Sequence, residues 1–68
     1  MSYNRRKFLA ALQRHGVVVL REGGSHSVIR GTSGKQSSLP RHTELNRITA
    51  RKIVKQLDLE WNRIEKEI

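Results

Sequence analysis

The sequence contains no cysteine, and it has only one tryptophan, one tyrosine and one phenylalanine among its 68 residues. The lack of cysteine excludes disulfides and thiolate metal sites, and it makes a reducing cytoplasm the expected setting. The scarcity of aromatic side chains argues against a platform on which single-stranded bases stack. Apolar runs such as residues 8–12 are far shorter than the roughly 20 residues of a membrane span. We therefore expect a cytoplasmic protein with no membrane partner.

Acidic residues are also few. Asp and Glu number 6 against 14 Lys and Arg, which gives a net charge of +8 at pH 7. Such an excess of positive charge indicates a polyanionic partner, with nucleic acid as the leading class. The first 21 residues hold no acidic side chain, whereas most of the acids lie within residues 58–68. The excess of positive charge therefore lies in residues 1–57.

Motifs for metal and cofactor binding are missing as well. The three histidines are scattered, no cysteine accompanies them, and none of them forms an i, i+4 pair on one helix. The segment "GTSGK" at residues 31–35 lacks the spacing of a phosphate-binding P-loop. The strand region offers only Glu22 as a carboxylate, too few for two-metal chemistry. We expect no metal and no small-molecule cofactor, so that any nuclease activity would be metal-independent.

Apolar residues spaced three and four apart predict a helix near each end of the chain. The first runs over residues 3–15, with Ser2 as its N-cap and Gly16 just past its end. The second begins at about Asn46. The apolar faces consist of Phe8, Ala11 and Leu12 in the first helix and Ala50, Ile53, Val54 and Leu57 in the second. The spacing continues beyond residue 57, so either one long helix follows or Asp58 breaks it and caps a short third helix.

Three strands are predicted between the helices. β-Branched residues and alternation favour strands at residues 17–22, 25–30 and 36–40. A turn at Gly23-Gly24 separates the first two, and the loop at residues 31–35 separates the second and third. In the middle strand, the side chains of Ser27 and Ile29 point one way and those of His26, Val28 and Arg30 point the other. The pattern therefore predicts an antiparallel meander between two helices.

This order predicts an α+β fold of the α-β-β-β-α type, in a single domain over residues 1–68. Both helices would cover one face of a three-stranded antiparallel sheet and leave the opposite face bare. In a protein of this charge, the bare face is where a polyanion or a partner protein would bind.

His26 is the first candidate for chemistry because it directly follows the diglycine turn. Imidazole gives or takes a proton near neutral pH, as the transesterification of RNA requires. Gly24 lets the backbone approach a phosphate, while Ser25 and Ser27 offer hydroxyl or N–H groups to its oxygens. The alternative is that a polar strand end after a turn accommodates a histidine with no chemical role.

Other polar residues could bind or assist. His42, beside Arg41, is either a second proton-transfer group or phosphate contact, or a solvated loop residue. His15 suits the negative end of the first helix dipole. Each phosphate that the protein neutralises would make its binding more sensitive to salt. The basic residues expected to contact RNA phosphates are Arg5, Arg6, Lys7, Arg30, Lys35 and Arg41.

Three segments carry a resemblance to a known family. They are Gly-Ser-His at residues 24–26, "LPRH" at residues 39–42 and "ITARKIVKQLDL" at residues 48–59. In this order, the chain resembles the HicA family of small mRNA-cleaving toxins from prokaryotic toxin–antitoxin pairs, over residues 3 to about 60. The resemblance implies a fold like that of double-stranded-RNA-binding domains and a catalytic role for His26, with Gly24 in the supporting turn. It also implies a HicB-type antitoxin that covers the toxin and blocks its active site.

The hypothesis is a metal-independent endoribonuclease that cleaves mRNA. His26 would assist attack of a ribose 2′-OH on the adjacent phosphate, either as base or as acid. The other proton transfer falls to His42 or to water. The competing interpretation is a non-catalytic RNA-binding module, because the basic segment "ARKIVKQ" at residues 50–56 is similar to the helix start of double-stranded-RNA-binding domains.

Overall fold

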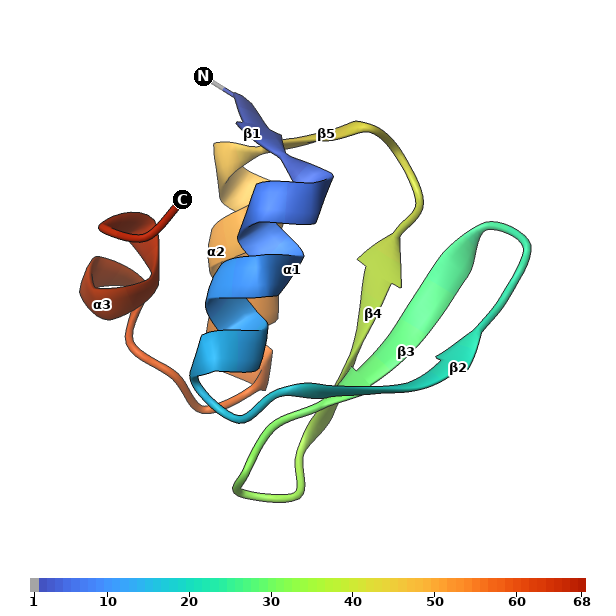
Figure 1. Cartoon of the computed structure of the whole chain (residues 1–68), viewed down its shortest axis with the longest axis horizontal. Coiled ribbons are helices and arrows are strands. Elements are labelled where there is room, and N and C mark those ends of the chain that lie inside the picture. Colours follow the sequence, from blue (N-terminus) through green and yellow to red (C-terminus); the bar gives the residue numbers. More distant parts are fainter. Residues whose placement is uncertain (1) are drawn as a thin grey trace.

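A three-stranded antiparallel sheet forms one layer of the protein, and the helices lie on one of its faces (Figure 1). The computed structural model describes residues 2–68. The elements are β1 (Ser2–Asn4), α1 (Arg5–Arg14), β2 (Val18–Glu22), β3 (His26–Arg30), β4 (Gln36–Pro40), β5 (Glu44–Asn46), α2 (Arg47–Gln56) and α3 (Trp61–Glu65). This arrangement confirms the predicted α+β fold and its central meander, in the order β2-β3-β4. Among residues 2–68, none of the helices has the length and hydrophobicity that a membrane span requires.

The pairing of β3 with β4 explains how a proline fits into the sheet. Pro40 lies opposite His26, and the next residue, Arg41, donates its N–H to the Ser25 carbonyl at 3.1 Å. Hydrogen-bonded and non-hydrogen-bonded pairs alternate along an antiparallel ladder, so the pair of His26 and Pro40 needs no N–H from position 40. Because β4 is also an edge strand, the missing N–H of Pro40 leaves no bond unmade.

The start of α1 differs from the prediction of a helix beginning at Tyr3 with Ser2 as its cap. Asn4 is the N-cap, and its side-chain oxygen accepts the Lys7 N–H at 3.0 Å. The residues before it form β1, which pairs antiparallel with β5, with Tyr3 opposite Leu45. Both Ser and Asn are good N-caps, and the pairing with β5 decides between them. The result is a separate two-stranded sheet at the start of α1 and α2.

A β-bulge in β2 decides which of its side chains face outward. The register shifts between Val19 and Arg21, so Arg21 lies opposite Val28 and Glu22 lies opposite Ser27. Residues directly opposite each other share one face of a sheet. Arg21 therefore joins the bare face, and Glu22 joins the face under the helices, which is the reverse of plain alternation from Val19.

One apolar cluster holds the sheet, α1 and α2 together. Ile29 and Leu39 from the sheet are fully buried against Phe8 and Leu12 of α1 and Val54 of α2. Burying side chains of this size contributes about 1.5–3 kcal/mol each. The cluster comprises Phe8, Ala11, Leu12, Val17, Ile29, Leu39, Leu45, Ala50, Ile53, Val54, Leu57 and Ile64. The predicted apolar faces of both helices are therefore confirmed.

The chain breaks its helix at Asp58, which has a φ of 64°. Of the two possibilities for this region, the broken helix is correct, although Glu60 and not Asp58 is the N-cap of α3. Ile64 of α3 is fully buried in the core. Glu67 accepts hydrogen bonds from Arg14 at 2.7 Å and pairs with His15 at 2.6 Å, which fixes the last residues against the end of α1.

Candidate functional site

His26 begins β3 and its ring is exposed on the bare face of the sheet. Its Nδ1 lies 3.2 Å from the Ser25 hydroxyl. The Gly23 N–H closes the preceding turn on the His26 carbonyl at 2.8 Å, and a Cβ on Gly23 would stand only 2.7 Å from that oxygen. A Cβ on Gly24 would meet nothing within 4 Å. The turn thus fixes the His26 backbone tightly while the space beside Gly24 stays open for a ligand.

Cationic side chains accompany His26 on this outer face. Arg30 lies at the other end of β3, and Lys35 lies in the loop that follows; both are exposed. Arg21 joins them, opposite Val28. The sequence pattern did not identify Arg21 as a candidate for RNA contact. Its side chain faces outward only because of the bulge at Leu20. The outer face therefore combines the His26 imidazole with the guanidinium groups of Arg30 and Arg21, and the exposed Lys35 lies in the adjoining loop.

A second cationic region lies beside the glycine turn. The first turn of α1 and the loop after β4 enclose a depression of about 490 Å³, with Arg6, Lys7, Arg41 and His42 on its walls. All four of these residues are exposed. Arg41 also donates from Nη1 to the Gly23 carbonyl at 3.1 Å, which connects this depression with the turn that carries His26. The structure thus brings Arg41 to the His26 turn and gathers the other three around the neighbouring depression.

A polar network lies beneath His26, on the inner face. Ser27 is fully buried; its hydroxyl donates to Glu22 and accepts a bond from Arg5 Nη2 at 2.9 Å. Arg5 Nε donates to the Pro40 carbonyl at 2.8 Å. Of the two groups that the sequence offers at Ser27, a hydroxyl and a backbone N–H, the hydroxyl is therefore bonded within the protein and faces the interior. Arg5 also lines the depression, but unlike Arg6 and Lys7 it is only partly exposed, because its guanidinium is bonded to the Ser27 hydroxyl and the Pro40 carbonyl.

The same network sets the charge state of Glu22. The hydrogen bond from Ser27 lowers the pKa of the Glu22 carboxyl, and the positive charges of Arg41 and Arg5 lower it further, while partial burial opposes them. The Glu22 carboxylate and the Arg5 guanidinium thus attract each other across the Ser27 hydroxyl to which both are bonded.

The three histidines lie in different surroundings. His15 caps the end of α1 and is paired with Glu67, in agreement with its predicted helix-end role. His42 lines the depression beside Arg41, two residues beyond Pro40, which is the cross-strand partner of His26. Within residues 2–68, no three His, Asp or Glu side chains gather in a way that could hold a metal ion.

Comparison with known proteins identifies the family of this chain. A family model described as "HicA toxin of bacterial toxin-antitoxin" matches residues 5–59. No curated protein and no solved structure matches the chain. The matched segment begins with α1 and includes His26, Arg41 and α2, whereas α3 lies outside it.

Proposed function

The chain belongs to the HicA family of toxins from bacterial toxin–antitoxin systems, and from this premise we propose that it is an endoribonuclease that cleaves mRNA. His26 is the general acid or base, and no metal ion takes part. The observation that carries the proposal is the exposed His26 ring on an open cationic sheet face, held at a strand end whose backbone is fixed from below.

The chemistry follows from the groups on this face. A ribose 2′-oxygen loses its proton and attacks the adjacent phosphorus, and the bond from phosphorus to the leaving 5′-oxygen breaks. The products are a 2′,3′-cyclic phosphate and a 5′-hydroxyl, so one proton is removed and one is delivered. His26 carries one of these transfers, and His42 or water carries the other. Arg41 and the backbone N–H groups of the glycine turn stabilise the negative charge on the phosphoryl oxygens.

The decisive experiment replaces His26 with alanine. Loss of general acid–base assistance lowers the cleavage rate by a factor of about 10² to 10⁴, while RNA binding stays close to that of the parent. The assay uses a structureless transcript in EDTA, so that contaminating metal-dependent nucleases are inactive. The matched control is His15→Gln, because His15 is paired with Glu67 on another part of the molecule. Equal cleavage by His26→Ala and the parent would refute the assignment.

The same assay separates this proposal from a non-catalytic RNA-binding module of the double-stranded-RNA-binding type. Such a module shifts RNA in a gel and leaves it intact, whereas the proposed enzyme yields fragments. His42→Gln then decides between His42 and water for the second transfer, since only a direct role lowers the rate by a further large factor.

The partner and the setting are part of the proposal. The family pairs each toxin with an antitoxin. We assign a HicB-type antitoxin that covers the His26 face, in the cytoplasm where mRNA is found. The surplus of cations on the toxin favours an acidic surface on that partner.

A further inference from the structure

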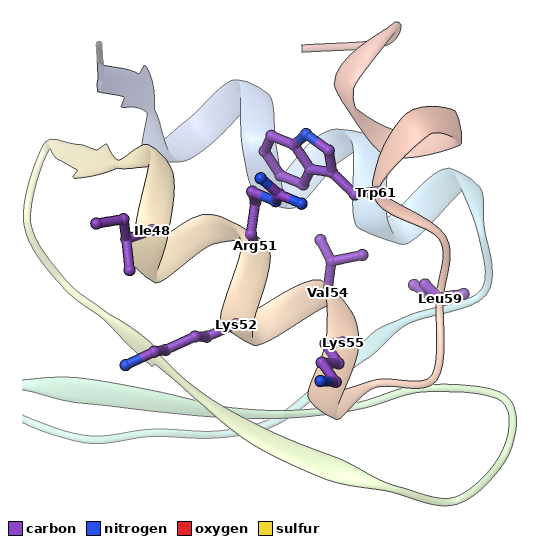
Figure 2. A pocket seen from close by; sticks show the side chains of 7 residues that line it. All are labelled: Ile48, Arg51, Lys52, Val54, Lys55, Leu59 and Trp61. Carbon is purple, nitrogen blue, oxygen red and sulfur yellow. The ribbon is translucent and has the colours of Figure 1, made fainter.

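A groove runs along α2 on the helical side of the molecule, where the chain returns through α3 (Figure 2). Its volume is about 440 Å³. Its walls are formed by Ile48, Arg51, Lys52, Val54, Lys55, Leu59 and Trp61. No acidic residue is among them. His26 faces outward from the sheet instead, so the groove is separate from the site described above.

The groove joins an apolar floor to a cationic rim. Val54, Leu59 and Trp61 supply the floor, and the Trp61 indole is fixed edge-on against the Tyr3 ring at a centroid distance of 5.5 Å. Ile48 lies at the rim, and 69% of its surface is exposed. Within residues 2–68, no other large hydrophobic side chain is as exposed. Exposed apolar surface of this kind, surrounded by charge, is typical of a binding site.

The rim residues follow one side of the helix. Ile48, Arg51 or Lys52, and Lys55 succeed one another at the three- and four-residue spacing that aligns side chains along a helix. With ten residues, α2 is about 15 Å long. A bound helical segment of about the same length would therefore reach all the rim cations.

We propose that this groove binds an acidic, amphipathic peptide segment of a partner protein. An apolar side chain of that segment sits between Ile48 and Trp61, and its carboxylates pair with Arg51, Lys52 and Lys55. RNA fits less well, because phosphates would satisfy the cations but leave Ile48 and the apolar floor uncovered. A second copy of this chain is disfavoured, because its own α2 would oppose these cations with cations.

The identification of this partner with the antitoxin rests on the proposed function, whereas the chemistry of the groove does not. A segment bound in the helical layer leaves the outer face of the sheet open. Its binding alone therefore does not inhibit RNA cleavage, and it acts as an anchor that is additional to any covering of His26.

The test uses Trp61 as its reporter, because it is the only tryptophan in the chain. A synthetic amphipathic peptide, with leucine at every third or fourth position and glutamate elsewhere, is titrated into the full His26→Ala chain while Trp61 emission is recorded. A saturable change in emission is expected. Ile48→Glu weakens the affinity by about tenfold or more, because it places a carboxylate at the apolar seat and against the peptide charge. The matched control is Val18→Glu, which also introduces a glutamate in place of an exposed β-branched residue, since Val18 of β2 is 47% exposed.

Three results would overturn the proposal. One is the absence of a saturable change up to about 1 mM peptide, the limit of a weak interaction. Another is an equal loss of affinity in Val18→Glu and Ile48→Glu, which would indicate general charge repulsion. The third is a short RNA that displaces the peptide and binds equally well to Ile48→Glu, which would make the groove a nucleic-acid site. None of these results depends on cleavage, so the assignment of His26 stands or fails separately in its own assay.

Discussion

The two faces of β3 are built from alternate residues of one strand, yet they have opposite properties. On the inner face, Ser27 and Ile29 are fully buried, and the Ser27 hydroxyl has a hydrogen-bond partner on each side. On the outer face, His26 and Arg30 are exposed, and the His26 ring has one weak contact, with the Ser25 hydroxyl. Buried, hydrogen-bonded side chains and exposed side chains are thus separated by a step of a single residue.

The inner face explains why the outer face can remain free. Arg5, Glu22, Ser27 and the Pro40 carbonyl come from four different elements and meet at the end of the sheet. Together they fix the backbone on which His26 stands. Since no bond of this network involves the imidazole, the ring is free for the role proposed for it. The comparison therefore predicts that changes on the inner face act on stability and changes on the outer face act on RNA.

Removing the Ser27 hydroxyl should have the largest effect on stability. Ser27→Ala leaves the Glu22 carboxylate and the Arg5 guanidinium without their shared partner, at a cost of about 1–3 kcal/mol. The free energy of unfolding, measured with urea, checks this value. Ser38→Ala is the matched control, because Ser38 is exposed on β4 opposite Val28. If both variants lost the same small amount, the network would not be what holds the strand end.

Much of this architecture could be predicted from the sequence, because local signals mark it. The boundaries of β3 and β4 follow from glycine, proline and alternation, and the core faces of both helices follow from their apolar spacing. The pair of β1 and β5 could not be predicted, since three-residue strands carry no pattern of their own. Their pairing joins residues 2–4 to residues 44–46 and exists only once the chain has folded.

The position of His26 on the bare face could be predicted from the sequence, whereas the side chains that surround it could not. The position of His26 follows from the turn and the strand period, and its exposure agrees with that prediction. The roles of Ser27 and Arg5 depend on a contact across 22 residues, which no local pattern indicates. Arg21 reaches the outer face only through the bulge in β2. Long-range contacts and one extra residue in a strand thus account for what the sequence did not reveal.

On the outer face, replacing Arg21 should have a smaller effect, and this effect should be on RNA affinity. If Arg21 neutralises one phosphate of single-stranded RNA, Arg21→Ser reduces the slope of log affinity against log salt by about 0.7 and weakens binding about fivefold at 0.1 M salt. Fluorescence anisotropy with the His26→Ala background keeps the RNA intact. Arg63→Ser is the control, because Arg63 lies on α3. An unchanged salt slope in Arg21→Ser would remove this residue from the proposed RNA-binding face.

Glu22 gives the smallest effect and tests the inner face through pH. Because the Ser27 hydrogen bond and nearby arginines lower its pKa in the folded protein, the stability that the Glu22 carboxylate contributes is complete above the ordinary glutamate value of about 4.3. That contribution is lost as the pH falls through the lower pKa of the folded state. Melting temperatures from pH 7 to pH 3 should therefore show Glu22→Gln less stable than the parent near neutrality, with the gap closing in acid. Glu60→Gln, whose side chain is 79% exposed, gives the background of removing one acid. In Ser27→Ala the closing gap should shrink, because the main cause of the lowered pKa is gone; a gap of constant size in the parent background would place Glu22 outside the network.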